Sequence, residues 1–355
     1  MLFEKAWAKL HGSYLQIVGG RVGPVLADLT GAPYEDFRWR TEGLGLGSCN
    51  LDDTWEQLAA ADNAGLPMAA AMPDIRNKDM QKQKGLVEGH AYAIVGTKLL
   101  AGGTIKLVEL RNPWGKGEEW TGKYSDDSDA WTTALKVEAD FDAKTKKDGR
   151  FHMELNDFVH YFYEFCVLDL QAGWSRAASK FKVATSGKAM AGIVKVNRQT
   201  PAVISIHQRD RRQLKTGDDL GWFRFEVFRV TDGASGSGSD LVLGGTSNRS
   251  DANVTVDLAP GNYRVVVWGT FPGDEARECS LSVYSEHPTQ LGMLDSFDDL
   301  LDVQLSEAHA KNILRNGEVV TPSDDKVTAA GIVVRLRHQG APSLLFFGIF
   351  PGGSH

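Results

Sequence analysis

The sequence predicts an α+β protein, in which an antiparallel sheet with flanking helices is followed by an all-β antiparallel sandwich. Two observations support the first part: apolar residues recur at helical spacing over residues 2–10, and two β-prone runs flank a glycine pair near residue 102. The second part rests on short β-rich runs that recur between turn residues from Phe181 onward. We therefore expect domains at residues 1–172 and 173–290, and leave residues 291–355 as an unassigned tail, with further strands of the β region as one interpretation.

The N-terminal part contains two predicted helices. The first covers Leu2 to Leu10, and the glycines and the proline at 19–24 predict a loop with a short strand or turn after it. The second covers Thr54 to Asn63, with Asp52 or Asp53 as its N-cap. This helix leads into an apolar run at residues 66–72, which predicts a buried strand.

A β-hairpin is predicted from the runs Ala91–Val95 and Thr104–Leu110. If His90 opens the first strand and Asn112 closes the second, the midpoint of the hairpin falls at Ala101, beside the glycine pair. The two residues would then be direct cross-strand partners, with Cα atoms about 4.5–5.5 Å apart. At that distance a side-chain amide can orient an imidazole, which is an arrangement that a hydrolase can use.

The residues around this pair supply apolar cover and a polar approach. Trp114 and Trp120 offer large apolar surfaces that shield the pair from water. Residues 73–88 are polar and precede His90, which fits a plain solvated connector or a loop that gates a site. The alternative for His90 itself is a structural role, because a single histidine in a strand is more often a satisfied structural residue than a catalyst.

Composition excludes several classes of protein. The chain has 355 residues, 42% of them hydrophobic, and a net charge of −7, which argues against a nucleic-acid-binding surface. No apolar run is long enough for a transmembrane segment, and the first twenty residues do not look like a signal peptide. Three cysteines without metal-type or redox-type spacing suit a reducing compartment, so we expect a cytoplasmic protein.

The second half is predicted to be a sandwich of short strands joined by turns. The β-rich runs are residues 202–207, 222–230, 241–243, 254–258, 263–268 and 279–285. The segment GASGSGS at 233–239 reads as a flexible hairpin tip. The tail carries an acidic amphipathic patch at 294–305 and β-prone runs at 332–336 and 344–350.

Several strings, in order, resemble the calpain family of papain-like cysteine proteases. EKAWAKLHGSY, GHAYAIVG, LRNPWG, EEWTGKYSDDSDAW and KDGRFHMELNDFVHYFYEFCVLDL look like the second catalytic subdomain and the segment that leads into it. The resemblance implies that His90 and Asn112 are the catalytic histidine and asparagine, with Trp114 shielding the site. More loosely, AVISIHQRDRR, LAPGNYRVVVWGTFPGDE and CSLSVYSE resemble the calpain β-sandwich domain.

The resemblance also implies calcium as a cofactor, in the acidic region after the hairpin. The family's ligands fall on the carboxylates of Glu119, Asp126 and Asp148 and on the backbone carbonyl of Lys146. The next expected carboxylate falls on Arg150, which removes a ligand and repels the ion, so we expect weak binding or none. The alternative is that this acidic run is a solvated face.

The nucleophile of a papain-like protease is not identified in this sequence. In calpains it lies on a first subdomain, in a Gly-rich motif that ends in Cys-Trp, whereas Cys49, Cys166 and Cys279 match no such motif. Two interpretations remain open: a calpain-like endopeptidase acting on protein substrates, present here without its nucleophile-bearing subdomain, or a catalytically inactive calpain-like module that binds protein partners. A third, a protein unrelated to calpains, leaves the ordered motifs unexplained.

Overall fold

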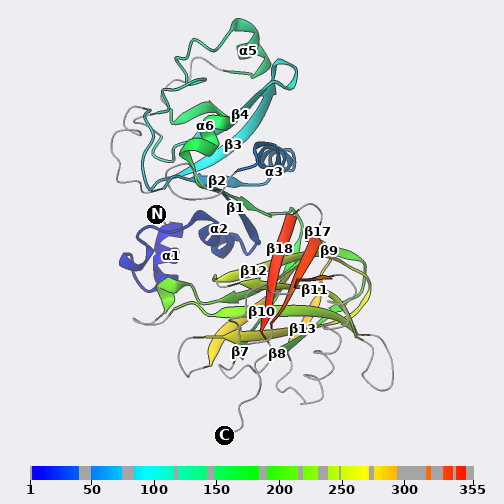
Figure 1. The fold of residues 1–355 in the computed structure, drawn as a ribbon. Coiled ribbons are helices and arrows are strands. Elements are labelled where there is room, and N and C mark those ends of the chain that lie inside the picture. Colours follow the sequence, from blue (N-terminus) through cyan, green and yellow to red (C-terminus); the bar gives the residue numbers. More distant parts are fainter. Residues whose placement is uncertain are drawn as a thin grey trace, which may run out of the picture. The chain divides into compact units, whose positions relative to one another are not determined.

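The computed structural model divides the chain into two compact units, Met1–Arg176 and Ala177–His355 (Figure 1). Each unit is described by itself. The structure describes residues 2–39, 49–73, 84–115, 119–141, 148–183, 190–214, 219–230, 239–247, 249–271, 276–293, 317–320, 331–338 and 341–348. None of the helices in these ranges is both long and apolar enough to cross a membrane.

The first unit is built on one six-stranded sheet with the order β1-β6-β2-β3-β4-β5. Each pairing in it whose register is described is antiparallel. Its elements are α1 (Leu2–His11), η1 (Leu15–Ile17), α2 (Val22–Thr30), β1 (Tyr34–Arg38), α3 (Leu51–Asn63), β2 (Met68–Ala71), β3 (Ala91–Leu100), η2 (Ala101–Gly103), β4 (Ile105–Arg111), α5 (Thr133–Glu138), β5 (Arg150–Glu154), α6 (Leu155–Tyr161) and β6 (Glu164–Leu168).

The hydrophobic core of this unit lies between the sheet and two helices, α3 and α6 (Figure 1). Strand β3 alternates as a half-buried strand should, with Tyr92 and Ile94 buried and Val95 exposed. These side chains share one core with Leu58 of α3 and Phe158 of α6, both fully buried. Burial of apolar surface in this shared core stabilises the packing of the two helices on the sheet, by about 25 cal/mol for each Å² removed from water.

Helix α2 corrects the prediction of a loop after the first helix. Pro24 lies in its first turn, where a residue without an N–H leaves no hydrogen bond unmade. Gly31 caps its C-terminus with a φ of 76°, in the left-handed region. The glycine and proline signals were therefore helix ends rather than loop markers, while the short strand expected in this region is β1.

The cap of α3 also differs from the predicted one. The N-cap of α3 is Asn50, whose side chain accepts the backbone N–H groups of Asp52 and Asp53, so those aspartates lie inside the first turn. Their charge there still favours the helix dipole. Helix α6 departs from the usual capping preference as well, since it begins at Leu155, after Glu154, and neither Asn156 nor Asp157 caps it.

The β3–β4 hairpin forms where expected, but its register differs from the predicted one. Ala93 pairs with Arg111 and Leu100 with Ile105, so His90 and Asn112 are not direct cross-strand partners. The turn is the 3-10 segment η2, which places the centre of the hairpin at the glycine pair instead of at Ala101. A β-bulge between Ile94 and Gly96 adds one more residue to β3.

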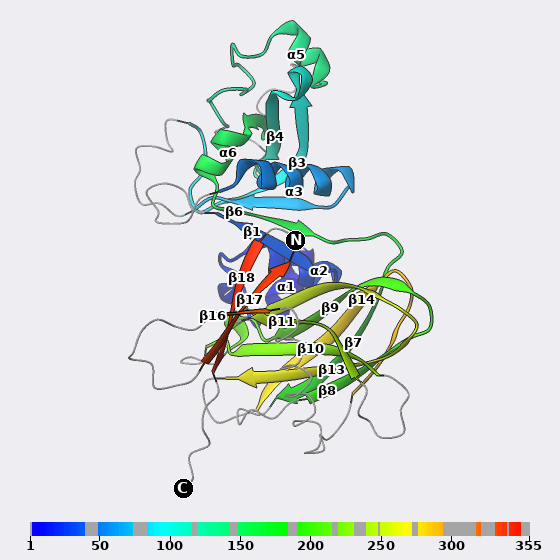
Figure 2. The same ribbon diagram turned by 45° about the vertical axis from the view of Figure 1, so that its right-hand side comes forward.

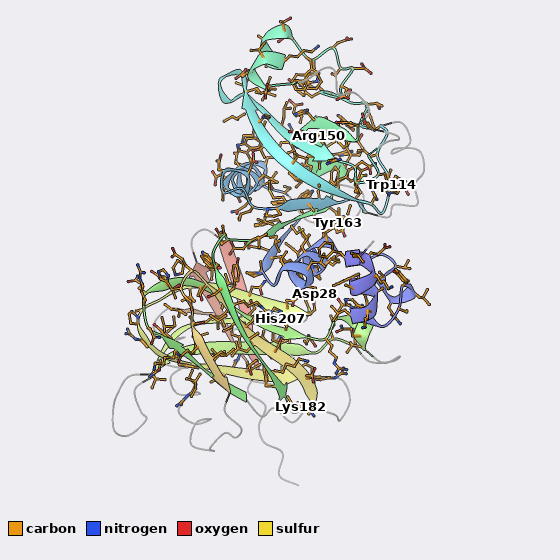
Figure 3. The ribbon with its side chains drawn as sticks, turned by 180° about the vertical axis from the view of Figure 1, so that it is seen from behind. Asp28, Trp114, Arg150, Tyr163, Lys182 and His207 are labelled. Atoms are coloured by element: carbon orange, nitrogen blue, oxygen red, sulfur yellow. The ribbon has the colours of Figure 1, made fainter. Side chains whose placement is uncertain are left out.

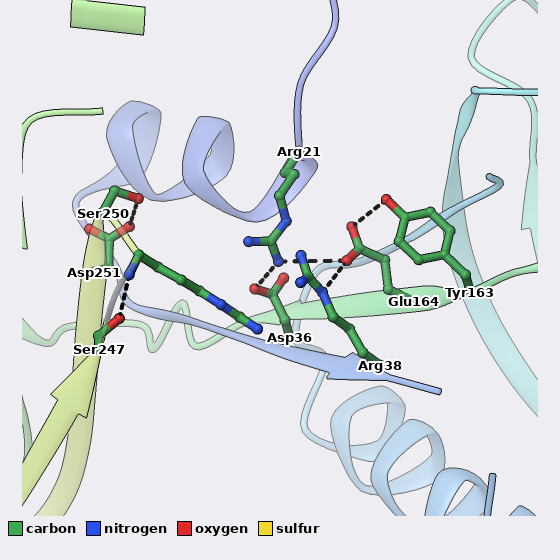
Figure 4. A network of polar contacts seen from close by, with 9 residues as sticks. Arg21, Asp36, Arg38, Tyr163, Glu164, Ser247, Ser250 and Asp251 are labelled. Atoms are coloured by element: carbon green, nitrogen blue, oxygen red, sulfur yellow. Dashed lines mark hydrogen bonds and ion pairs between the residues drawn. The ribbon is translucent and has the colours of Figure 1, made fainter. Parts of the chain in front are cut away.

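A buried charge network ties α2 to the β1 edge of the sheet (Figure 4). Arg21, at the N-cap of α2, pairs with Asp36 of β1. Glu164 of β6 accepts from Arg38 Nε at 2.6 Å and from the Tyr163 hydroxyl at 3.2 Å. Burial and the neighbouring carboxylate raise the pKa of Tyr163 to about 12. Glu164 also lies 3.6 Å from Arg21, so the two arginines together compensate the two buried carboxylates.

The second unit contains two stacked sheets that share one hydrophobic core (Figure 2). Their strand orders are β11-β10-β13-β8-β15 and β12-β9-β14-β7. A third sheet, β16-β17-β18, follows near the C-terminus. The strands are β7 (Ser175–Val183), β8 (Met190–Val196), β9 (Thr200–Gln208), β10 (Trp222–Val230), β11 (Ser239–Ser247), β12 (Asp251–Leu258), β13 (Gly261–Thr270), β14 (Arg277–Ser285), β15 (Gln290–Met293), β16 (Gly317–Val320), β17 (Gly331–His338) and β18 (Ala341–Gly348), with a short 3-10 segment, η3 (Arg211–Gln213).

All six β-rich runs predicted for this half lie in strands, while β7, β8, β15 and β16 were not predicted. Strand β7 alternates charged and small residues, so its apolar content is too low to stand out. Most of the segment predicted as a flexible hairpin tip, residues 233–239, and the acidic patch at 294–305 lie outside the described residues. The division between the units falls a few residues after the boundary expected at residue 172.

Candidate active site

His90 and Asn112 lie at the open end of the β3–β4 hairpin, one just before β3 and the other just after β4. The backbone carbonyl of His90 accepts from the N–H of Met72 at 2.9 Å, which anchors the histidine beside the end of β2. On the other side, Pro113 ends β4 because it has no N–H for the ladder. The open end of the hairpin thus brings together two residues that are 22 positions apart in the sequence.

The two side chains are in hydrogen-bond contact, with His90 Nε2 3.0 Å from Asn112 Oδ1. The same oxygen accepts the backbone N–H of Trp114 at 3.1 Å. Since a backbone N–H can only donate, this contact fixes which end of the amide faces the histidine. Asn112 is only 2% exposed, so its hydrogen bonds form largely away from water. The predicted meeting of the pair is confirmed, although through diagonal positions instead of direct ones.

Two aromatic rings lie against the imidazole of His90. The ring centroid of Trp114 lies 4.4 Å from it, and that of Tyr92 lies 5.0 Å away in an edge-on arrangement. Trp114 is 64% exposed, and Figure 3 labels it. Trp120, also expected to shield the pair, instead packs in the core against Tyr161, with its Nε1 donating to a backbone carbonyl.

Tyr92 is a supporting residue that the sequence did not single out. Its hydroxyl accepts the backbone N–H of Val87 at 2.9 Å, which ties the segment before His90 to β3. Burial raises the pKa of this tyrosine, so the hydroxyl stays neutral. Tyr92 lies in an apolar run, so the sequence predicts only that it belongs to the core. The spacing of residues does not show which backbone N–H its hydroxyl contacts.

The residues that the resemblance assigns to calcium make contacts of their own. Glu119 Oε1 accepts the N–H of Gly149 at 2.6 Å, and Asp148 Oδ1 accepts that of Arg150 at 2.9 Å. Arg150 also pairs with Glu109 (Figure 3 labels this arginine). Asp126 lies in a turn region next to Ser125, and Lys146 is outside the described residues. Among the described residues, no group of three or more His, Cys, Asp or Glu side chains is placed to hold a metal ion.

The three cysteines have properties opposite to those of an activated nucleophile. Burial raises the pKa of each thiol, to about 12 for Cys166 and Cys279. Cys49 is partly buried, and its sulfur lies 3.0 Å from the hydroxyl of Thr54. A reactive thiol needs a pKa below its ordinary value, so these three remain protonated at neutral pH.

Comparison with known proteins relates most of the first unit to one protein family. The family model described as calpain family cysteine protease matches residues 1–168. Calpain-12 of Homo sapiens is 40% identical over 163 residues, which cover 45% of this chain and 21% of the relative. The calpain-type cysteine protease DEK1 of Zea mays is 37% identical over 163 residues, covering 45% of this chain and 7% of the relative. The catalytic subunit of Calpain-2 of Homo sapiens is 26% identical over 367 residues, covering 86% of this chain and 49% of the relative.

The chain spans less than half of the length of each of these relatives. Among solved structures, the cysteine protease and lectin-like domains of Cwp84 from Clostridium difficile match 65% of this chain and 49% of that one, at 12% identity. The TM-score of 0.21 is too low to support an argument about the fold. The sequence match and the ordered motifs agree, and the chain therefore carries a calpain family cysteine protease domain over residues 1–168.

Proposed function

We propose that the first unit supplies the histidine and the asparagine of a calpain-type cysteine endopeptidase that cleaves cytoplasmic proteins. The observation that carries this proposal is the 3.0 Å contact between His90 Nε2 and Asn112 Oδ1. The amide oxygen can only accept, so Nε2 must carry the proton in that contact. The imidazole then presents Nδ1, with its lone pair, to a thiol.

The chemistry that follows from this tautomer is proton transfer. Nδ1 takes the proton of a cysteine thiol, and the thiolate attacks the carbonyl carbon of the scissile peptide. When the C–N bond breaks, the imidazolium returns its proton to the leaving amine, and water later releases the acyl group from sulfur. Asn112 keeps the ring in one orientation throughout, and Trp114 limits access of water from outside.

The nucleophile must come from a separate subdomain in this proposal, since burial raises the pKa of all three thiols of the chain. The resemblance places it in a Gly-rich segment that ends in Cys-Trp. The same observation favours a second candidate function, a catalytically inactive calpain-like module that binds protein partners. In either case, we take residues 173–290 to be the calpain β-sandwich domain.

The proposal is tested by supplying a nucleophilic cysteine on a separate subdomain. The chain is mixed with, or fused to, a calpain first subdomain that bears the Cys-Trp motif, and cleavage of a fluorogenic casein-type substrate is measured. We expect no turnover by the chain alone and turnover by the combination. His90→Ala should abolish the rescued activity, while Asn112→Ala should reduce it less, because orientation of the base contributes less than proton transfer.

Covalent labelling separates the two candidate functions. A thiol-directed protease inhibitor should label the cysteine of the added subdomain and none of the chain's own three. Labelling of Cys49 together with turnover would contradict the proposal. A combination that folds, binds the chain and still shows no turnover would favour the inactive binding module.

A further inference from the structure

A carboxylate outside the pair reaches the backbone that carries Asn112. Glu119 Oε1 accepts the N–H of Gly149 at 2.6 Å, a short, charge-assisted hydrogen bond. Gly149 is buried and has a φ of 91°, a conformation that favours glycine. The carboxylate therefore holds a backbone segment that few other residues could form.

Gly149 in turn holds Asn112. The carbonyl of Gly149 accepts the N–H of Asn112 at 2.7 Å, and a Cβ built on Gly149 would lie 2.9 Å from the carbonyl oxygen of Asn112. The same Cβ would lie 3.1 Å from Cα of Gly115. Two backbone segments thus touch directly, and a continuous chain of contacts runs from Glu119 through Gly149 and Asn112 to His90.

The next residue, Arg150, fixes the other side of the same segment. Its guanidinium contacts Glu109 Oε1 through Nε at 2.9 Å and through Nη2 at 2.8 Å, and its N–H donates to Asp148 Oδ1. Glu109 and Arg150 come from the neighbouring strands β4 and β5. This geometry holds the start of β5 beside the end of β4, where Asn112 follows.

These contacts do not fit the calcium site that the resemblance implies. Arg150 carries a permanent positive charge at the position of an expected carboxylate, and one oxygen of Glu119 and one of Asp148 already accept backbone N–H groups. The side chains of Glu119, Asp148 and Glu109 already have partners within the protein around residues 148–150.

We infer that Glu119 is a positioning residue for the His90–Asn112 pair, and that the Glu119–Gly149 and Arg150–Glu109 contacts order this end of the site without calcium. The inference rests on the proposed function, because positioning matters only if His90 and Asn112 are catalytic. Its test measures spectra and amide exchange, and does not require enzyme activity. Its failure would leave the rescue experiment above unaffected, and the reverse also holds.

The test uses the whole chain labelled with ¹⁵N, in a chelator and then in millimolar calcium. Long-range ¹H–¹⁵N spectra report which nitrogen of His90 carries the proton, and amide exchange reports the Gly149 N–H. We expect a single Nε2–H tautomer and a protected Gly149 amide in the chelator, unchanged by calcium. In Glu119→Ala the Gly149 amide should exchange about tenfold faster or more, and the single tautomer should be lost.

Two variants serve as controls. Glu119→Gln should restore the protected amide, because the side-chain carbonyl of glutamine can accept the same N–H. Glu138→Ala should leave both signals unchanged, although Glu138 also accepts a backbone N–H, that of Ala101 at the far end of the same hairpin. The inference is overturned if a folded Glu119→Ala keeps the His90 tautomer. Should that variant fail to fold, the wild-type spectra decide, since a His90 tautomer or Gly149 protection that forms only with calcium overturns it equally.

Discussion

At Asn112, one buried amide oxygen accepts two N–H groups, and both depend on that single atom. Asn112→Ala would leave the N–H of Trp114 and the ring of His90 without their acceptor. We expect the free energy of unfolding to fall by about 1–3 kcal/mol. Denaturant titration measures this, and His90→Ala is the matched comparison. His90→Ala should cost less, because the amide oxygen keeps its bond to Trp114; an equal or larger cost would contradict this account.

His152 shows how a buried side chain makes stability depend on pH. Its ring packs against Trp131 and Phe141, and neither ring nitrogen has a hydrogen-bond partner among the described residues. Burial lowers the pKa of His152 below its ordinary value of 6.5, and Lys98 and Arg150 lower it further, while Glu109 opposes them. The unfolded chain therefore takes up a proton near pH 6.5 that the folded chain takes up only at lower pH.

The sign of the expected effect follows from that difference. Folding stability contributed by neutral His152 is present above pH 6.5 and decreases as the pH falls below it, by at most about 1.4 kcal/mol per pH unit. His152→Phe removes this contribution to the pH dependence. The variant should gain stability relative to the wild type between pH 7 and pH 5, as measured by denaturant titration at each pH. A constant difference across that range would show that His152 titrates alike in both states.

Among the elements, the β3–β4 hairpin was predicted in kind, place and pairing, because its two β-prone runs and its glycine pair are all local signals. The register was wrong because the turn is centred at the glycine pair instead of at Ala101, which shifts every cross-strand partner. Helix α2 was missed for another reason. Proline and glycine occur at helix ends as well as in loops, so Pro24 and Gly31 alone do not show whether the residues between them are helical. Similarly, the contact of Glu119 with Gly149 joins residues 30 apart through a backbone atom, which no residue pattern reveals.

Three strands of the second unit are joined by the side chain of His207. Its Nδ1 lies 2.6 Å from Asp251 of β12, and its Nε2 lies 2.8 Å from the hydroxyl of Ser282 of β14. This order of groups is that of a serine hydrolase, but Ser282 is 3% exposed in the middle of a strand, where no substrate carbonyl can reach it. The trio therefore acts as a structural clamp.

Removing the clamp gives a prediction on stability. His207→Ala deletes one hydrogen bond to a carboxylate and one to a hydroxyl, so the second unit should lose about 2–4 kcal/mol. Ser282→Ala deletes only the second bond and should cost about 1 kcal/mol. Thermal unfolding followed by circular dichroism measures both. Equal losses in the two variants would show that the bond to Asp251 contributes nothing.

The loop around β5 allows the implied calcium site to be tested by design. Arg150→Glu removes the pair with Glu109 and changes the local charge by two units towards negative, and ligand charge is one of the factors that set calcium affinity. We expect isothermal titration calorimetry to detect calcium binding by the variant and none, or only weak binding, by the parent. Arg150→Gln, which breaks the pair without adding a carboxylate, is the control. Tight binding by the parent would show that the loop does hold calcium.

Across the whole chain, each unit has its own hydrophobic core. A fragment ending at Arg176 keeps every described contact of the His90–Asn112 site, from Met72 to Glu119 and Gly149. We expect this fragment to unfold cooperatively and to show the same His90 tautomer as the full chain in ¹H–¹⁵N spectra. A fragment that is unfolded, or that shows a mixture of tautomers, would mean that the second unit is needed to order the first.

The bulge in β3 has a consequence for how this hairpin tolerates insertions and deletions. Ile94 pairs with Leu110 and Gly96 pairs with Glu109, so Val95 is the extra residue that has no partner. It separates the end of the hairpin that carries the His90–Asn112 pair from the end that carries the turn. Deleting Val95 would remove the unpaired residue, so Ile94 and Gly96 would keep their partners in a regular ladder, whereas deleting a paired residue of β3 would shift one end by one position and turn its side chains to the opposite face. Insertion of two residues in the exposed η2 turn leaves the strand pairing on both sides of the bulge unchanged. Length variation among related hairpins should therefore collect at the turn in pairs or at the bulge as a single residue, while a single-residue change at a paired position of β3 should disrupt the site.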